Sequence, residues 1–133
     1  MMKITEILQV LSDTTRLRIL RLLGQEELSV AELQEVLEMG QSRISSHLSL
    51  LRRNEMVQDR KDGKKTFYVL DLDDSPKFDL VRMALQEDGD DEFWPSDQSA
   101  HFRIVESRRR ESEKYFEEVA ERLGKNYVPG RSW

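Results

Sequence analysis

The polar side chains between Gln41 and Asn54 have the types and spacing needed to read the edges of base pairs. Arg43 carries a guanidinium fork that pairs with guanine, and Gln41 carries an amide that pairs with adenine. Short hydroxyl side chains, which reach phosphates or bases without blocking a groove, accompany them at Ser42, Ser45, Ser46 and Ser49. Serine is a mediocre helix former, so this clustering favours contact with a ligand over a merely solvated surface. His47 either contacts a phosphate or packs at the helix edge.

A second set of side chains suits contact with the phosphate backbone. Residues 41–65 carry seven basic side chains against three acidic ones, whereas residues 71–98 carry two against ten. The net charge of −5 therefore hides a local basic face. We expect salt-dependent backbone contacts from Arg52, Arg60, Lys61, Lys64 and Lys65. The acidic stretch looks like a solvated or repulsive surface.

Two helices are required to position the polar face. Ile44, Leu48 and Leu51 share one side of the helix that begins at Gln41, so the polar residues lie on the opposite side. Before it, Ser29 and Glu32 form a Ser-x-x-Glu capping box for a helix that ends near residues 39–40. Two helices joined through a glycine are typical of a helix-turn-helix.

The hydrophobic period then changes from 3.6 to 2, which predicts a hairpin. Its strands are expected at Val57 to Arg60 and Thr66 to Leu70, around a turn from Lys61 to Lys65 that contains the pair Asp62-Gly63. A basic-tipped hairpin directly after a helix-turn-helix is a wing. The expected fold is mainly α with a small β-hairpin: a winged helix-turn-helix with extra N- and C-terminal dimerisation helices.

Further helices flank this unit. A short amphipathic helix starts at Ile4, and a second runs from about Thr14 to Leu23, capped by Asp13, with Leu17 on its buried side and Gly24 as its stop. Another opens at Ser75-Pro76, residues 93–96 look like a loop, and a long charged helix covers about 99–123. We expect a DNA-binding domain at 1–72, a helical dimerisation or linker region at 73–124 and an irregular tail at 125–133. The predicted dimerisation residues are Ile4, Ile7, Leu8, Leu11, Val105, Tyr115, Phe116, Val119 and Leu123.

Composition limits the function classes. The 133 residues are 38% hydrophobic and 35% charged, which suits a helical protein that buries more apolar surface by dimerising. There is no cysteine, no apolar run long enough to span a membrane and no signal-peptide pattern, so we expect a cytoplasmic protein. No nucleophile, base and orienting group occur in a catalytic arrangement, which argues against an enzyme.

The string from Leu11 to Leu23, LSDTTRLRILRLL, closely resembles the second-helix signature of ArsR-type regulators, the arsenic-repressor-like winged-helix family. Residues 28–33, 42–48 and 57–70 resemble its third helix, recognition helix and wing in order. The resemblance implies a homodimer paired through its first and last helices, which binds an imperfect palindrome in double-stranded DNA as a repressor released by an inducer. Two residues depart from the pattern: Thr14 replaces a frequent proline, and Glu55 a common glycine before the wing.

The inducer is expected to be a small molecule sensed without thiolates, because many relatives sense metals through cysteines that this chain lacks. A His and carboxylate site would rest on His101 with Asp97, and we predict no metal and no cofactor. Residues 108–133 are similar to the linker of regulators fused to an S-adenosylmethionine-dependent methyltransferase. This resemblance leads us to expect a chain truncated before that domain and its glycine-rich turn. The alternatives are the N-terminal regulatory part of such an enzyme and a winged-helix protein-interaction module.

Overall fold

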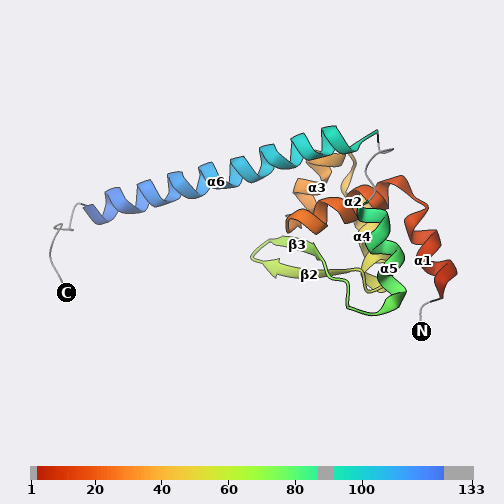
Figure 1. The fold of residues 1–133 in the computed structure, drawn as a ribbon. Coiled ribbons are helices and arrows are strands. Elements are labelled where there is room, and N and C mark those ends of the chain that lie inside the picture. The colour runs from red at the N-terminus through yellow and green to blue at the C-terminus, as the bar shows by residue number, and fades with distance from the viewer. Residues whose placement is uncertain (1–2, 87–91, 125–133) are drawn as a thin grey trace. The chain divides into compact units, whose positions relative to one another are not determined.

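The computed structural model describes residues 3–86 and 92–124, and Figure 1 shows the elements in chain order. They are α1 (Ile4–Leu11), α2 (Thr14–Gln25), β1 (Leu28–Ser29), α3 (Val30–Leu37), α4 (Gln41–Arg53), β2 (Val57–Asp62), β3 (Lys65–Leu70), the 3-10 turn η1 (Pro76–Phe78), α5 (Asp79–Gln86) and α6 (Trp94–Gly124). The chain divides into two compact units, one up to His101 and one from Phe102 onward. The predicted tail, 125–133, lies outside the described residues. No helix in the described ranges is both long and apolar enough to cross a membrane.

Helix α2 supplies the centre of the core. Ile19, Leu20 and Leu22 are completely buried, whereas Leu17, predicted to face inward, is only half-buried. The Asp13 side chain caps the helix by accepting a hydrogen bond from the Arg16 N–H at 3.2 Å. The predicted stop at Gly24 is wrong, because the helix continues to Gln25. A Cβ at Gly24 would lie 3.3 Å from Leu70 Cδ2, so the glycine instead permits β3 to approach closely.

The predicted capping box of α3 is confirmed. The Ser29 hydroxyl accepts from the Glu32 N–H at 3.1 Å, and the Glu32 carboxylate accepts from the Ser29 N–H at 2.8 Å. Glu38 ends the helix in the left-handed region with φ 54°. Gly40 then caps α4, which follows α3 within a few residues. The two helices therefore form the predicted helix-turn-helix.

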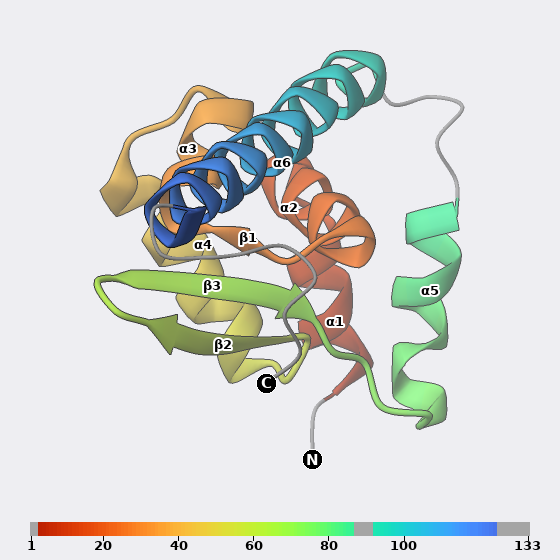
Figure 2. The same ribbon diagram turned by 90° about the vertical axis from the view of Figure 1, so that its left-hand side faces the viewer.

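The wing belongs to a three-stranded antiparallel sheet of order β1-β3-β2, with β3 in the middle (Figure 2). The strand β1 was not predicted; it pairs Leu28 with Tyr68. Both wing strands are longer than predicted, since Asp62 pairs with Lys65. The turn is thus the two-residue loop Gly63-Lys64, with Gly63 at φ 62°, which suits the hairpin turn whose first central residue is glycine.

The last helix, α6, starts earlier than expected, whereas the helical segment before it opens at the predicted Ser75-Pro76. Pro76 opens η1 and α5 follows, and Phe78 and Val81 are buried. The predicted loop at residues 93–96 is wrong, because α6 begins at Trp94. Pro95 lies in the first turn of α6, where a missing N–H costs no helical hydrogen bond.

Candidate nucleic-acid interface

Three apolar side chains anchor α4 to the domain and fix which face points outward. Ile44, Leu48 and Leu51 are 0% exposed. Their spacing places them on one side, as predicted, and packs α4 against α2, α3 and β2. A helix anchored along its whole inner face presents its outer face in a fixed orientation.

The outer face of α4 carries the predicted base-reading side chains. Most of them are exposed: Gln41, Ser42, Arg43, Ser46 and Ser49. Ser45 and His47 are half-buried at the edge of this face. The structure therefore gathers an amide, a guanidinium and short hydroxyls on one accessible surface, which matches the donor and acceptor chemistry of a major groove.

His47 lies in a mixed electrostatic environment between α4 and the start of α2. Partial burial lowers the pKa of the His47 imidazole. The Asp13 carboxylate opposes this by raising the pKa, while the Arg16 and Arg43 guanidinium groups lower it further. The neutral imidazole is therefore favoured near neutral pH, and it offers a hydrogen bond rather than a charge.

Two of the arginines predicted to contact the phosphate backbone of DNA form ion pairs with acidic side chains of this chain. Arg52 Nε lies 3.0 Å from Asp59 Oδ1 on β2 in an ion pair. Arg60 pairs with Glu27, and its guanidinium lies 4.9 Å from the centre of the Phe67 ring. The hydrogen bond from Arg60 to Glu27 raises the pKa of the arginine. These pairs orient the wing against the helical domain and reduce the charge available for phosphates.

The lysines at the wing tip are arranged differently. Lys61, Lys64 and Lys65 are exposed, and within the described ranges they form no ion pair. They bracket the tight turn at Gly63, so the hairpin carries a compact cluster of positive charge beyond α4. Such a cluster suits contacts with a phosphate backbone.

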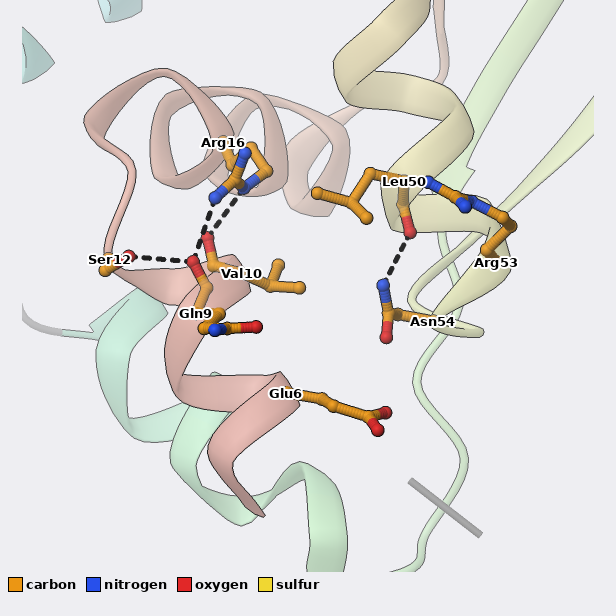
Figure 3. A pocket seen from close by; sticks show the side chains of 8 residues that line it. All are labelled: Glu6, Gln9, Val10, Ser12, Arg16, Leu50, Arg53 and Asn54. Atoms are coloured by element: carbon orange, nitrogen blue, oxygen red, sulfur yellow. Dashed lines mark hydrogen bonds between the residues drawn. The ribbon is translucent and has the colours of Figure 1, made fainter. Parts of the chain in front are cut away.

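A pocket of 570 Å³ lies between α1 and the C-terminal end of α4 (Figure 3). Arg16 forms part of its wall, donating from Nε to Val10 O at 2.9 Å and from Nη2 to Gln9 O at 2.8 Å. These bonds cap the C-terminal carbonyls of α1. The pocket was not predicted, because its walls come from three separate helices: Glu6, Gln9, Val10, Ser12, Arg16, Leu50, Arg53 and Asn54.

The predicted dimerisation residues fall into three groups by exposure: exposed, half-buried and buried. On α1, Ile4 and Leu8 are exposed, whereas Ile7 is 1% exposed and belongs to the core of its own domain. Leu11 is half-buried. On α6, Tyr115, Phe116 and Leu123 are exposed. Val105 and Val119, on the same helix, are half-buried. Met83 and Phe102 are further exposed apolar residues that were not predicted.

A buried ion pair ties the first turn of α6 to α2. Arg18 donates from Nε to Asp97 Oδ2 at 2.9 Å and from Nη2 to Asp97 Oδ1 at 2.8 Å. The Asp97 side chain is completely buried, and the guanidinium carbon lies 4.2 Å from the centre of the Phe93 ring. The expectation that the acids of 71–98 are a solvated surface is thus wrong for Asp97. The Asp97 carboxylate accepts both hydrogen bonds from Arg18. Within the described ranges, no cluster of three or more potential metal ligands occurs.

Comparison with known proteins supports the same fold. Residues 13–59 match the family described as "Bacterial regulatory protein, arsR family". The chain is 43% identical over 75 residues to the arsenical resistance operon repressor of Staphylococcus aureus, covering 54% of this chain and 72% of that protein. It is 43% identical over 68 residues to the transcriptional activator HlyU of Vibrio cholerae, covering 51% of this chain. That match spans 63% of the length of HlyU.

The solved structure of HlyU from Vibrio cholerae resembles this one with a TM-score of 0.53 and 35% identity, over 62% of this chain and 83% of that one. An anchored recognition helix beside a basic-tipped hairpin defines a winged helix-turn-helix, the fold of DNA-binding transcriptional regulators. The chain belongs to the arsR family of bacterial regulatory proteins.

Proposed function

We propose that this chain is a cytoplasmic, homodimeric transcriptional regulator that binds an imperfect palindromic operator in double-stranded DNA. The observation that carries the proposal is the polar outer face of α4, held by three fully buried side chains and adjoined by the lysines of the wing. This combination supplies both requirements of specific binding, namely base-edge contacts and phosphate contacts.

In the proposed complex, the N-terminal half of α4 enters the major groove. Arg43 pairs with a guanine and Gln41 with an adenine, while the exposed serines reach bases or phosphates nearby. Lys61, Lys64 and Lys65 contact the backbone beside the site. Arg52 and Arg60 contribute less, because Asp59 and Glu27 already neutralise them.

A homodimer supplies the symmetry of the operator, because two copies of α4 one helical turn of DNA apart read two half-sites. The exposed apolar side chains of α1 and α6 support this assembly, among them Ile4, Leu8, Phe116 and Leu123. Regulation as a repressor is supported by the name of the Staphylococcus aureus relative. Because this chain has no cysteine, its small-molecule inducer is sensed by other chemistry.

The test is footprinting on the DNA upstream of the chain's own gene, with Arg43→Ala compared with Arg110→Ala. Both arginines are exposed helical residues, but Arg110 lies on α6 and is not among the residues predicted to contact DNA. We expect a protected palindrome for the wild type and Arg110→Ala, and a loss of about tenfold or more in affinity for Arg43→Ala. Equal binding by all three proteins, or no protection, would overturn the proposal.

A further inference from the structure

The unit that begins at Phe102 is a helix whose apolar residues follow a seven-residue repeat. Phe102 and Val105 lie three residues apart, and Phe116, Val119 and Leu123 follow after a gap of eleven residues at spacings of three and four. With Phe102 placed at position a, they all occupy positions a or d of one heptad register. This register continues unbroken from residue 102 to residue 123, so the stripe stays on one side of the helix.

The stripe is open to solvent in the single chain. Phe102 is 65% exposed, Phe116 69% and Leu123 62%, whereas the positions between them are mostly charged. An isolated helix with this pattern gains little from its own hydrogen bonds, and covering the apolar stripe supplies the missing stabilisation. The exposed stripe therefore needs a partner of the same length and pattern.

We propose that residues 102–123 of α6 form a parallel, in-register, two-stranded coiled coil with the same segment of a second copy. This inference rests on the proposed homodimer and adds the direction and register of its helical contact. In the parallel arrangement each apolar a or d residue packs against the same residue of the partner subunit. These residues are Phe102, Val105, Phe116, Val119 and Leu123.

Charge complementarity selects the parallel direction. Arg108 occupies position g and Glu113 the following position e, so Arg108 lies opposite Glu113 of the partner subunit, and the reverse pair forms by symmetry. The antiparallel register that best matches the apolar layers sets Phe102 against Val119 of the partner subunit. That register forms no such Arg–Glu pair, since Arg108 then lies opposite Tyr115 of the partner subunit.

The middle of the repeat is polar, and its guanidinium group, that of Arg109, is held by two glutamates of the same helix. Arg109, at position a, donates from Nη2 to Glu106 Oε2 at 2.9 Å and from Nη1 to Glu113 Oε1 at 2.7 Å. Both glutamates occupy position e, which borders the seam, so the guanidinium is drawn outward and neutralised. Ser112 occupies the next position d, so two adjacent polar layers lower the stability of the coiled coil and help to fix its register.

The absence of cysteine from the chain makes a direct test possible. Val119→Cys places a thiol at position d, and Glu121→Cys places one at position f on the outer side of the same helical turn. In the full-length protein under mild oxidation, we expect Val119→Cys to form a covalent dimer at least about tenfold faster than Glu121→Cys, because only facing d positions satisfy disulfide geometry.

A mixture of Phe102→Cys and Val119→Cys proteins tests the opposite direction. These positions are about 25 Å apart along the helix, so they crosslink to each other only in the antiparallel pairing. Light scattering and operator binding are measured on the same samples. A DNA-binding dimer without the Val119→Cys crosslink, or with the mixed crosslink, overturns the parallel coiled coil alone. A monomer overturns the homodimer as well.

Discussion

Removing Asp97 should destabilise the N-terminal unit far more than removing an exposed acid. Asp97→Ala would leave Arg18 charged, with a side chain only 10% exposed and both of its hydrogen bonds to the carboxylate lost. Breaking a buried ion pair from one side costs about 3–5 kcal/mol. Since domains are stable by only about 5–15 kcal/mol, this loss is a large share of the total.

The assay is denaturant unfolding at one fixed protein concentration, which matters because dimerisation contributes to stability. A double-mutant cycle adds Arg18→Met and the double variant Arg18→Met with Asp97→Ala. We expect the double variant to be markedly more stable than Asp97→Ala, because no buried charge remains unpaired. Asp79→Ala is the matched control, since Asp79 is an exposed acid paired with Arg82 on the same helix. A cost for Asp97→Ala below about 1 kcal/mol, as for an exposed pair, would refute the reasoning.

Three further predictions concern local structure, and each is read out in the same unfolding assay. Glu55→Gly should stabilise by about 1 kcal/mol, because Glu55 adopts φ 60° and loses only an exposed ion pair with Lys77; a decrease would contradict this. Ser29→Ala should cost about 1 kcal/mol through the capping box, while Ser29→Gly should cost only a few tenths, and equal losses would argue against a cap. The pKa of His47 is lower in the folded chain than in the unfolded chain, so the unfolded chain binds the proton more readily. Stability should be fully present above about pH 6.5 and fall below it, and His47→Gln should flatten that fall; an unchanged pH profile would show that His47 does not contribute.

Local rules predicted the parts of the fold that depend on neighbouring residues. The capping box at Ser29 and the N-cap at Asp13 are set by residues three apart, so they are visible in the sequence. The inner face of α4 was predicted for the same reason, because helical periodicity alone separates Ile44 and Leu48 from the polar residues. The helix-turn-helix and the wing followed from such signals.

The errors share a physical cause, which is dependence on distant or competing contacts. Arg18 and Asp97 are 79 residues apart in sequence, and Arg60 and Glu27 are 33 residues apart. No local sequence pattern therefore predicts either ion pair. The strand β1 has two residues and exists only because β3 pairs with it. Pro95 was read as a loop signal although the first turn of a helix tolerates proline.

The proposed DNA-binding surface was predicted as a set of residues, but the ion pairs within it were not. Exposure of the α4 face and of the wing lysines agrees with the positions expected from the sequence. The neutralisation of Arg52 by Asp59 required knowledge of where β2 lies relative to α4. Charge counts along a sequence therefore overestimate the cations available to a phosphate backbone.

The measurement that tests the central claim most directly is the salt dependence of operator binding, followed by fluorescence anisotropy for the wild type and for Lys64→Ala/Lys65→Ala. We expect the affinity to fall steeply with salt, and the double variant to bind more weakly with a slope shallower by about 2. Arg43→Ala should instead reduce the preference for the operator over a scrambled duplex. Affinity that is insensitive to salt, equal for both duplexes and unchanged in these variants would contradict DNA recognition by α4 and the wing.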